Sequence, residues 1–270
     1  MFSDSFDPRV TNEFASAAFR FGHSLIPSNF LSMSKRTRFR TQGVTKKMKL
    51  REIFFKPQEM SSSPEMTDNL IRGMTNQDGE AWDNVFSEDV VNHLFETKPN
   101  SGGMDLVALN IQRGRDHGIP GYNTYREAVG VGRARNFDDL RDSISPEYVQ
   151  KLKKLYDDVD DIDLFVGGFL EKKHKDSLIG PAFKSIIGDT FIRLKYGDRF
   201  FYDLGKDKNT RFTPRQLQEI RKTSMSRVFC DNSEIDEIQP QAFLKEGEFP
   251  NIKTQCDDVS AIPRVNLGVF

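Results

Sequence analysis

The amino-acid sequence predicts a mainly α-helical protein with little β-structure. In several stretches, apolar side chains recur at spacings of three and four residues, which is the period of one face of a helix. Some of these stretches begin at an Asp, Ser or Thr followed by proline, a pair that favours the first turn of a helix. The pairs are Asp7-Pro8, Ser145-Pro146 and Thr213-Pro214.

The composition is that of a globular chain with no feature that attracts nucleic acid or a membrane. With 270 residues, of which 37% are hydrophobic and 29% charged, one substantial core is expected. The net charge of −1 creates no field that would draw nucleic acid or anionic lipid. No apolar run could cross a bilayer, and the residues from Met1 to Asp7 lack the apolar region of a signal peptide.

The first predicted helix has Asp7 as its N-cap, Pro8 in its first turn and Pro27 as its stop. One apolar stripe runs along it. The stripe consists of Val10, Phe14, Ala17, Ala18, Phe21 and Leu25.

This helix carries the candidate metal ligand, His23. Phe19 and Arg20 precede His23 by four and three residues, so the three side chains share a neighbouring face. An imidazole beside an aromatic ring and a cation suits a flat, apolar, dianionic ligand such as haem. Taken alone, a histidine near a helix end more often bonds a carbonyl or offsets the helix dipole.

A second segment favours the haem interpretation. It reads Asn110-Ile-Gln-Arg113-Gly-Arg115-Asp116-His117-Gly118-Ile-Pro-Gly121-Tyr-Asn123. Together with Ala18-Phe-Arg-Phe-Gly-His23, it resembles the hallmark motifs of the animal haem peroxidases, the family of myeloperoxidase, peroxidasin and the peroxinectins.

The resemblance implies that His23 is the proximal axial ligand of the iron of haem b. It also implies that Asn110 hydrogen-bonds the second nitrogen of His23. An iron-bound imidazole needs its other N–H held by an acceptor, here an amide oxygen. Arg20 and Arg113 would pair with the haem propionates, with Phe19 beside the ring.

The remaining segments are predicted as framework. Residues 28–60 are expected to form an irregular connector. Its eight cations between Lys35 and Arg51 are interpreted as a solvated loop rather than a phosphate or heparin patch. Short helices are expected at Asp68–Gly73 and Val85–Phe95. Asp105 is expected to cap a helix carrying Asn110 and Arg113.

Four further expectations concern the second half of the chain. The glycines of Asp161–Gly168 are expected to permit a close turn. A helix after Gly180-Pro181, ended by Gly197, is expected to bury a stripe that includes Phe191. The adjacent Asp116 and His117 suggest a general base but are interpreted as framework. The acidic run from Asp157 to Asp163 does not have the spacing of a calcium loop.

Cys230 and Cys256 are the only cysteines. Their positions resemble a disulfide of the family, which would contribute about 3 kcal/mol in an oxidising compartment. In a cytosolic protein they would more often be free thiols.

In the family, the distal histidine and arginine, a calcium site and carboxylates that can link to haem come before the proximal histidine. Residues 1–22 match none of them, so residues 1–270 are expected to be a partial domain, its proximal half, with no catalytic residue of its own. The chain is therefore expected to be weak or inactive alone. Homo-oligomerisation, or pairing with the missing half, is expected to cover its exposed face.

The function implied by the resemblance is a secreted haem peroxidase that reduces hydrogen peroxide. A phenol, a halide or another small reductant would supply the electrons. The alternative is a non-enzymatic protein, a truncated module that binds haem or acts in adhesion.

Overall fold

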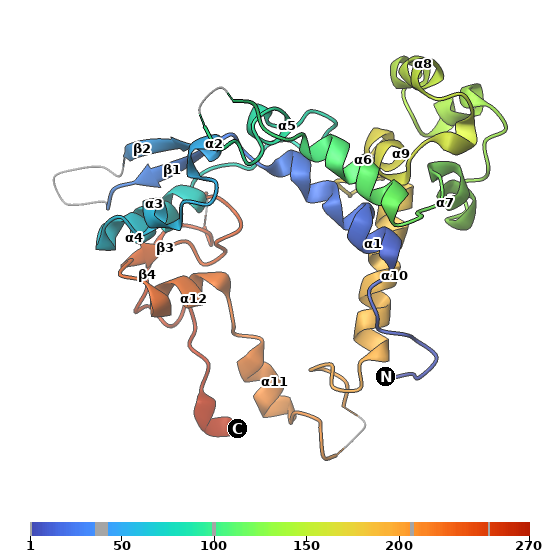
Figure 1. Ribbon diagram of the computed structural model, residues 1–270. Coiled ribbons are helices and arrows are strands. Elements are labelled where there is room, and N and C mark those ends of the chain that lie inside the picture. The colour runs from blue at the N-terminus through green and yellow to red at the C-terminus, as the bar shows by residue number, and fades with distance from the viewer. Residues whose placement is uncertain (1, 36–42, 99–100, 206–207, 248) are drawn as a thin grey trace. The chain divides into compact units, whose positions relative to one another are not determined.

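The computed structural model describes residues 2–35, 43–98, 101–205, 208–247 and 249–270. Within these ranges the protein is mainly helical, as predicted, and its strands form two short antiparallel sheets (Figure 1). The chain divides into two compact units. The first unit comprises Met1–Ile26, Glu80–Leu94 and Ser101–Lys206. The second comprises Pro27–Gly79, Phe95–Asn100 and Asp207–Phe270.

The first unit is a helical assembly around an aromatic-rich core that includes Tyr122, Phe169 and Phe183. The 3₁₀ helices are labelled η. Its helices are α1 (Asn12–Ser16), η1 (Ala18–Leu25), α5 (Glu88–Val91), α6 (Leu106–Asp116), α7 (Tyr122–Ala128), η2 (Phe137–Asp142), α8 (Pro146–Leu155), η3 (Val159–Asp161), α9 (Leu164–Leu170) and α10 (Pro181–Gly197).

The second unit combines short helices with both sheets around a smaller core of Ile71, Ile235, Ile238 and Ile262. Its elements are β1 (Asn29–Met33), β2 (Val44–Lys49), α2 (Leu50–Ile53), α3 (Pro57–Met60), α4 (Pro64–Met74), α11 (Pro214–Ile220), α12 (Met225–Asn232), β3 (Glu237–Ile238), β4 (Thr254–Gln255) and η4 (Leu267–Val269).

The prediction of an irregular connector at residues 28–60 is wrong. β1 and β2 pair antiparallel from Asn29 opposite Lys49 to Met33 opposite Val44, with a bulge after Ser32. The lysines of β2 are mostly exposed, whereas Met48 is buried, so the strand packs only one side against the unit. Three of the eight cations, Arg36, Arg38 and Arg40, lie outside the described residues.

The first helix begins later than predicted. α1 starts at Asn12, and Asp7 does not cap it, because its carboxylate accepts from the backbone N–H and the Nε of Arg9. The chain changes to 3₁₀ winding after Ala17, so His23 lies on η1 rather than on an α-helix. Val10, which precedes α1, is 52% exposed and does not belong to the buried stripe.

The glycines of Asp161–Gly168 serve close packing rather than the predicted turn, because Gly167 and Gly168 lie inside α9. A Cβ on Gly167 would lie 2.1 Å from the ring of Tyr122, and one on Gly168 would lie 2.2 Å from the ring of Phe183. Both core rings therefore pack directly on the α9 backbone. Phe191, expected in the buried stripe of α10, is 52% exposed.

Several local predictions are confirmed. Asp105 accepts hydrogen bonds from the backbone N–H groups of Val107 and Ala108, at 2.7 and 3.1 Å, and so caps α6. Thr213 opens α11 with both hydrogen bonds of a capping box. Cys230 and Cys256 form the predicted disulfide, which links α12 to the residue that follows β4.

A buried carboxyl, Glu171, joins three elements of the first unit. It accepts hydrogen bonds from the hydroxyl of Tyr122 and from the backbone N–H of Ala182 in the first turn of α10, each at 2.8 Å. Glu171 is only 3% exposed. Burial raises the pKa of Glu171 above its ordinary value of 4.5, so the folded state favours the neutral acid.

We expect Glu171→Gln to change the pH dependence of stability. Because the folded-state pKa is raised, the stability that Glu171 contributes is complete below about pH 4.5 and is lost as the pH rises through its folded value. The unfolding free energy of the wild type should therefore fall relative to that of the variant as the pH rises towards neutrality. Denaturant unfolding at a series of pH values measures this, and parallel curves for the two proteins would contradict it.

Candidate functional site

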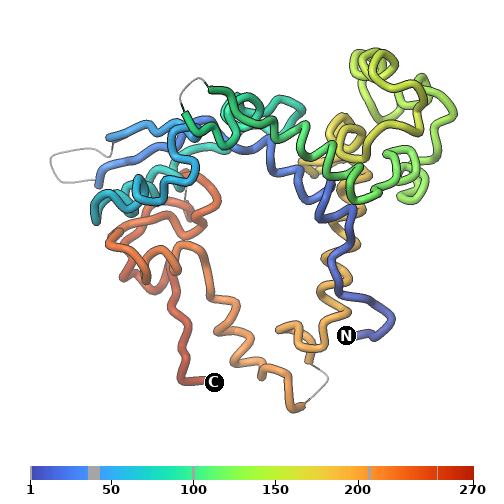
Figure 2. Tube along the Cα trace, in the orientation of Figure 1, coloured from blue at the N-terminus to red at the C-terminus, as the bar shows by residue number. Residues whose placement is uncertain are grey.

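The predicted site residues come together where the N-terminal segment runs alongside α6 (Figures 1 and 2). The two segments run antiparallel. Asn12, at the start of α1, contacts His117 at the end of α6, while His23 contacts Asn110 near the middle of α6. This pairing brings residues that are 87 positions apart in the sequence into direct contact.

Asn110 is the centre of the contacts around His23. Its side-chain nitrogen lies 3.1 Å from Nδ1 of His23 and donates to the carbonyl oxygen of Leu106 at 2.6 Å. Its side-chain oxygen accepts from Nη1 of Arg20 at 2.6 Å. Asn110 is 0% exposed, so the amide is fixed by these partners inside the protein.

The predicted contact between Asn110 and His23 is present, but the opposite end of the amide faces the ring. The guanidinium of Arg20 can only donate, and the carbonyl of Leu106 can only accept. These two partners require the amide oxygen to face Arg20 and its nitrogen to face Leu106. In this arrangement Nδ1 of His23 accepts, and its proton lies on Nε2.

The 3₁₀ winding of η1 explains why Arg20 and His23 reach the same amide. In a 3₁₀ helix, residues three apart lie directly above one another, whereas in an α-helix they are offset around the axis. Arg20 also donates through Nε to the carbonyl oxygen of Ala15 at 3.0 Å. Because only residues three apart lie above one another in a 3₁₀ helix, Phe19, four residues before His23, does not share this face, contrary to the α-helical expectation.

The charges at the site favour a neutral imidazole. Burial, and secondly the nearby Arg20 guanidinium, lower the pKa of His23. Burial, and secondly Arg113, lower the pKa of Arg20. Two guanidiniums thus lie close enough to repel each other beside a neutral histidine.

Arg113 is exposed on α6 and has no hydrogen bond or ion pair within the described ranges. Two residues further along the helix, Arg115 pairs with both carboxylate oxygens of Asp163, at 2.9 and 2.7 Å. Arg115 is thus committed to the framework, whereas Arg113 is free to bind an anion.

Phe19 presents an aromatic surface beside the site. Its ring stacks on Phe14 with the centroids 4.5 Å apart, and it also lies edge-on to Phe21. Phe19 is 50% exposed, so one side of this aromatic group remains open.

The other histidines have different surroundings. His93 lies 3.5 Å from Glu88, His117 bonds Asn12, and His174 lies beside Lys184. In the described part of the chain, no group of three or more His, Cys, Asp or Glu side chains could hold a metal ion. The acidic run from Asp157 to Asp163 therefore forms no such group, and Asp116 bonds Gln112 rather than acting with His117.

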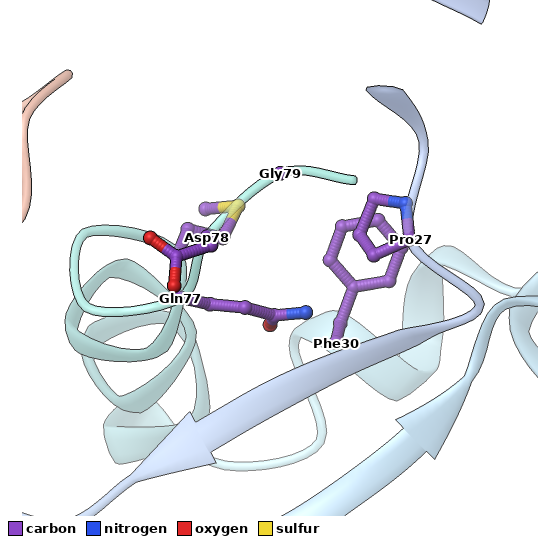
Figure 3. Close-up of a pocket in the computed structure, with 6 residues that line it drawn as sticks. Pro27, Phe30, Gln77, Asp78 and Gly79 are labelled. Atoms are coloured by element: carbon purple, nitrogen blue, oxygen red, sulfur yellow. The ribbon is translucent and has the colours of Figure 1, made fainter. Parts of the chain in front are cut away.

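A pocket of about 200 Å³ in the second unit contains none of the predicted site residues (Figure 3). Pro27, Phe30 and Met74 form its apolar wall, and Gln77 and Asp78 its polar side. The amide of Gln77 already bonds the backbone of β1, and Asp78 already pairs with Lys245 at 2.8 Å. The pocket thus offers apolar surface but no uncommitted charge.

Two features of the site were not predicted from the sequence. One is the bond from Asn110 to Leu106, which reverses the expected amide. The other is the pair of hydrogen bonds between Asn12 and His117. Leu106 and Asn110 are four residues apart on a helix, and this spacing could have indicated their hydrogen bond. The contact of Asn12 with His117 depends on how α1 packs beside α6, which the sequence does not show.

The comparisons with known proteins bear on the family of the chain. The family model described as animal haem peroxidase matches residues 1–243. The chain is 36% identical over 268 residues to a chorion peroxidase of Drosophila melanogaster and 40% identical over 267 residues to a peroxidase of the same organism. Each match covers 98% of this chain but only 32% and 37% of the relative.

A solved structure, peroxidase A from Dictyostelium discoideum, superposes with a TM-score of 0.70 at 30% identity. The match covers 93% of this chain and 44% of that one. The chain thus spans about a third of the length of the curated relatives named above. No helix among the described residues is long and apolar enough to cross a membrane.

Proposed function

Because the chain belongs to the animal haem peroxidase family, we propose that it binds haem through His23 and contributes to the reduction of hydrogen peroxide. The single observation that supports this most strongly is the partly buried contact of His23 with Asn110. It orients a neutral imidazole by one nitrogen. No hydrogen bond within the described residues engages the other nitrogen, Nε2, which is the atom that would bind the iron. Nε2 carries the proton in the present arrangement, so iron binding would require that proton to move to Nδ1 and the Asn110 amide to turn its oxygen towards Nδ1.

The surrounding residues suit the other parts of a haem. Haem, when bound, would supply the redox-active iron for peroxide reduction at the expense of a phenol, a halide or another small reductant. Arg113, exposed and without a partner in the described chain, would hold one propionate. Arg20 would hold Asn110 through Nη1 and offer its remaining nitrogen to the second propionate. Phe19 would cover one apolar edge.

The proposal includes the role of residues 1–270 as the proximal part of a peroxidase domain. His93, His117 and His174 each bond another partner, Glu88, Asn12 and Lys184 respectively, so we assign none of them the acid–base role. The residues of this chain would thus hold haem b and orient its ligand. Calcium and the acid–base residues would belong to the other half. The disulfide supports an oxidising, extracellular location.

Arg113→Ala is expected to weaken haemin binding by about tenfold, the typical effect of removing a charge-assisted hydrogen bond. Absorbance titration of the protein with haemin measures the dissociation constant. Arg115→Ala is the matched control, because it removes an arginine of the same helix that is paired with Asp163. Equal affinities for the wild type and Arg113→Ala, or an equal loss in both variants, would contradict the propionate role.

A further inference from the structure

We infer that Asn12 and His117 act as positioning residues that hold His23 against Asn110. This inference rests on the proposed function, because the contact of His23 with Asn110 orients a haem ligand only if His23 binds haem. The two residues lie at the start of α1 and just after α6, and no hydrogen bond among the described residues joins either side chain to His23, Arg20 or Asn110. We call their paired hydrogen bonds the clamp.

The clamp is reciprocal. Nδ2 of Asn12 donates to the carbonyl oxygen of His117 at 3.1 Å, and Nδ1 of His117 lies 2.9 Å from Oδ1 of Asn12. Since an amide oxygen only accepts, Nδ1 of His117 carries the proton. The hydroxyl of Ser16, one turn further along α1, also donates to this oxygen at 3.2 Å and helps to fix the amide.

The segment that carries His23 depends on such an anchor. α1 has only five residues and no side-chain cap, and helices this short are not stable by themselves. η1 then continues for eight residues, whereas 3₁₀ runs rarely exceed three or four. Contacts with the rest of the protein must therefore maintain both the winding and the direction of this segment.

The winding decides where His23 points. A 3₁₀ helix turns about 120° and rises about 2.0 Å per residue, against about 100° and 1.5 Å for an α-helix. If the five steps from Ala18 to His23 changed to α-winding, the imidazole would rotate by about 100° and move by about 2.5 Å relative to α1. His23 thus reaches Asn110 only while η1 keeps its 3₁₀ winding and α1 its present rotation, and the clamp joins the start of α1 to the end of α6.

The clamp can be tested without haem in the complete 270-residue chain. We expect Asn12→Ala and His117→Ala to shift the ¹⁵N signals of the His23 imidazole. We also expect both to speed hydrogen exchange of the η1 amides by about tenfold, the typical effect of losing one hydrogen bond that holds the segment. His117→Asn should restore wild-type behaviour, because its side-chain amide places an N–H donor near the position of Nδ1. Gln112→Ala, which breaks an exposed bond within α6, is the control.

Haemin titration of the same variants distinguishes a failure of the clamp from a failure of the proposed function. Weaker binding in Asn12→Ala and His117→Ala, with rescue by His117→Asn, supports the clamp. If the variants match Gln112→Ala in the imidazole signals and in exchange, the clamp is wrong. It is also wrong if exchange rises equally in α10, because that is general destabilisation. If the imidazole signals respond but His23→Ala leaves the haemin spectrum unchanged, the clamp stands and the proposed function fails.

Discussion

His23→Ala is expected to abolish the absorbance spectrum of histidine-ligated haem when the chain is titrated with haemin. The variant removes the imidazole that contacts Asn110, and the other histidines of the described chain bond Asn12, Lys184 and Glu88 instead. Loss of an outer-shell partner of a metal ligand typically weakens metal binding by about 10- to 100-fold, so loss of the ligand itself should exceed that range. The measurement is the position and intensity of the Soret band over the titration.

The control for this experiment is His174→Ala. Haemin binds many exposed histidines weakly, and His174 is an exposed histidine of the same unit that lies beside Lys184 rather than near Asn110. It should therefore leave the spectrum unchanged. If His23→Ala and the wild type give the same spectrum and affinity, His23 is not the ligand and the proposed function fails at its first step.

The local signals in the sequence were reliable where the interaction is itself local. Asp105 and the Thr213–Gln216 capping box bond backbone groups two or three residues away, so residue types and spacing contain all the information needed. The disulfide and the pairing of His23 with Asn110 are long-range. They were predicted only because whole motifs resembled those of a known family.

Most of the errors depended on partners from elsewhere in the chain. Asp7 is the exception, because its competing partner is local: Asp7 was expected to cap a helix, but Arg9, two residues away, takes its carboxylate and lowers its pKa to about 2. The α-helical spacing placed Phe19 with His23, but tertiary contacts hold that segment in 3₁₀ winding. The amide of Asn110 is reversed because Leu106 and Arg20 both constrain it.

Gly73 shows how little a sequence reveals about close packing. A glycine inside a helix usually destabilises it by roughly 0.5–1 kcal/mol relative to alanine, so Gly73 in α4 looks unfavourable when the helix is considered alone. The structure supplies the reason. A Cβ on Gly73 would lie 1.6 Å from the carbonyl oxygen of Leu31 in β1. The helix and the strand touch through their backbones at this point.

Gly73→Ala is therefore expected to destabilise the second unit by more than about 3 kcal/mol, the upper end of the usual range for overpacking. The atoms in the way belong to the backbone of β1, which cannot turn aside as a side chain can. Moving α4 outwards would also break the bonds from Gln77 to the backbone of Leu31 and Asn29, at 3.1 and 2.6 Å. Hydrogen exchange of the β1 and α4 amides, combined with denaturant unfolding, measures the loss.

Gly188→Ala is the matched variant, because Gly188 is also inside a helix, α10, but a Cβ there would meet nothing within 4 Å. It should stabilise the protein by roughly 0.5–1 kcal/mol through helix propensity alone. Opposite signs for the same substitution in two helices would show that contact with β1, rather than helix formation, requires glycine at position 73. If Gly73→Ala is also neutral or stabilising, α4 and β1 do not approach as closely as described here.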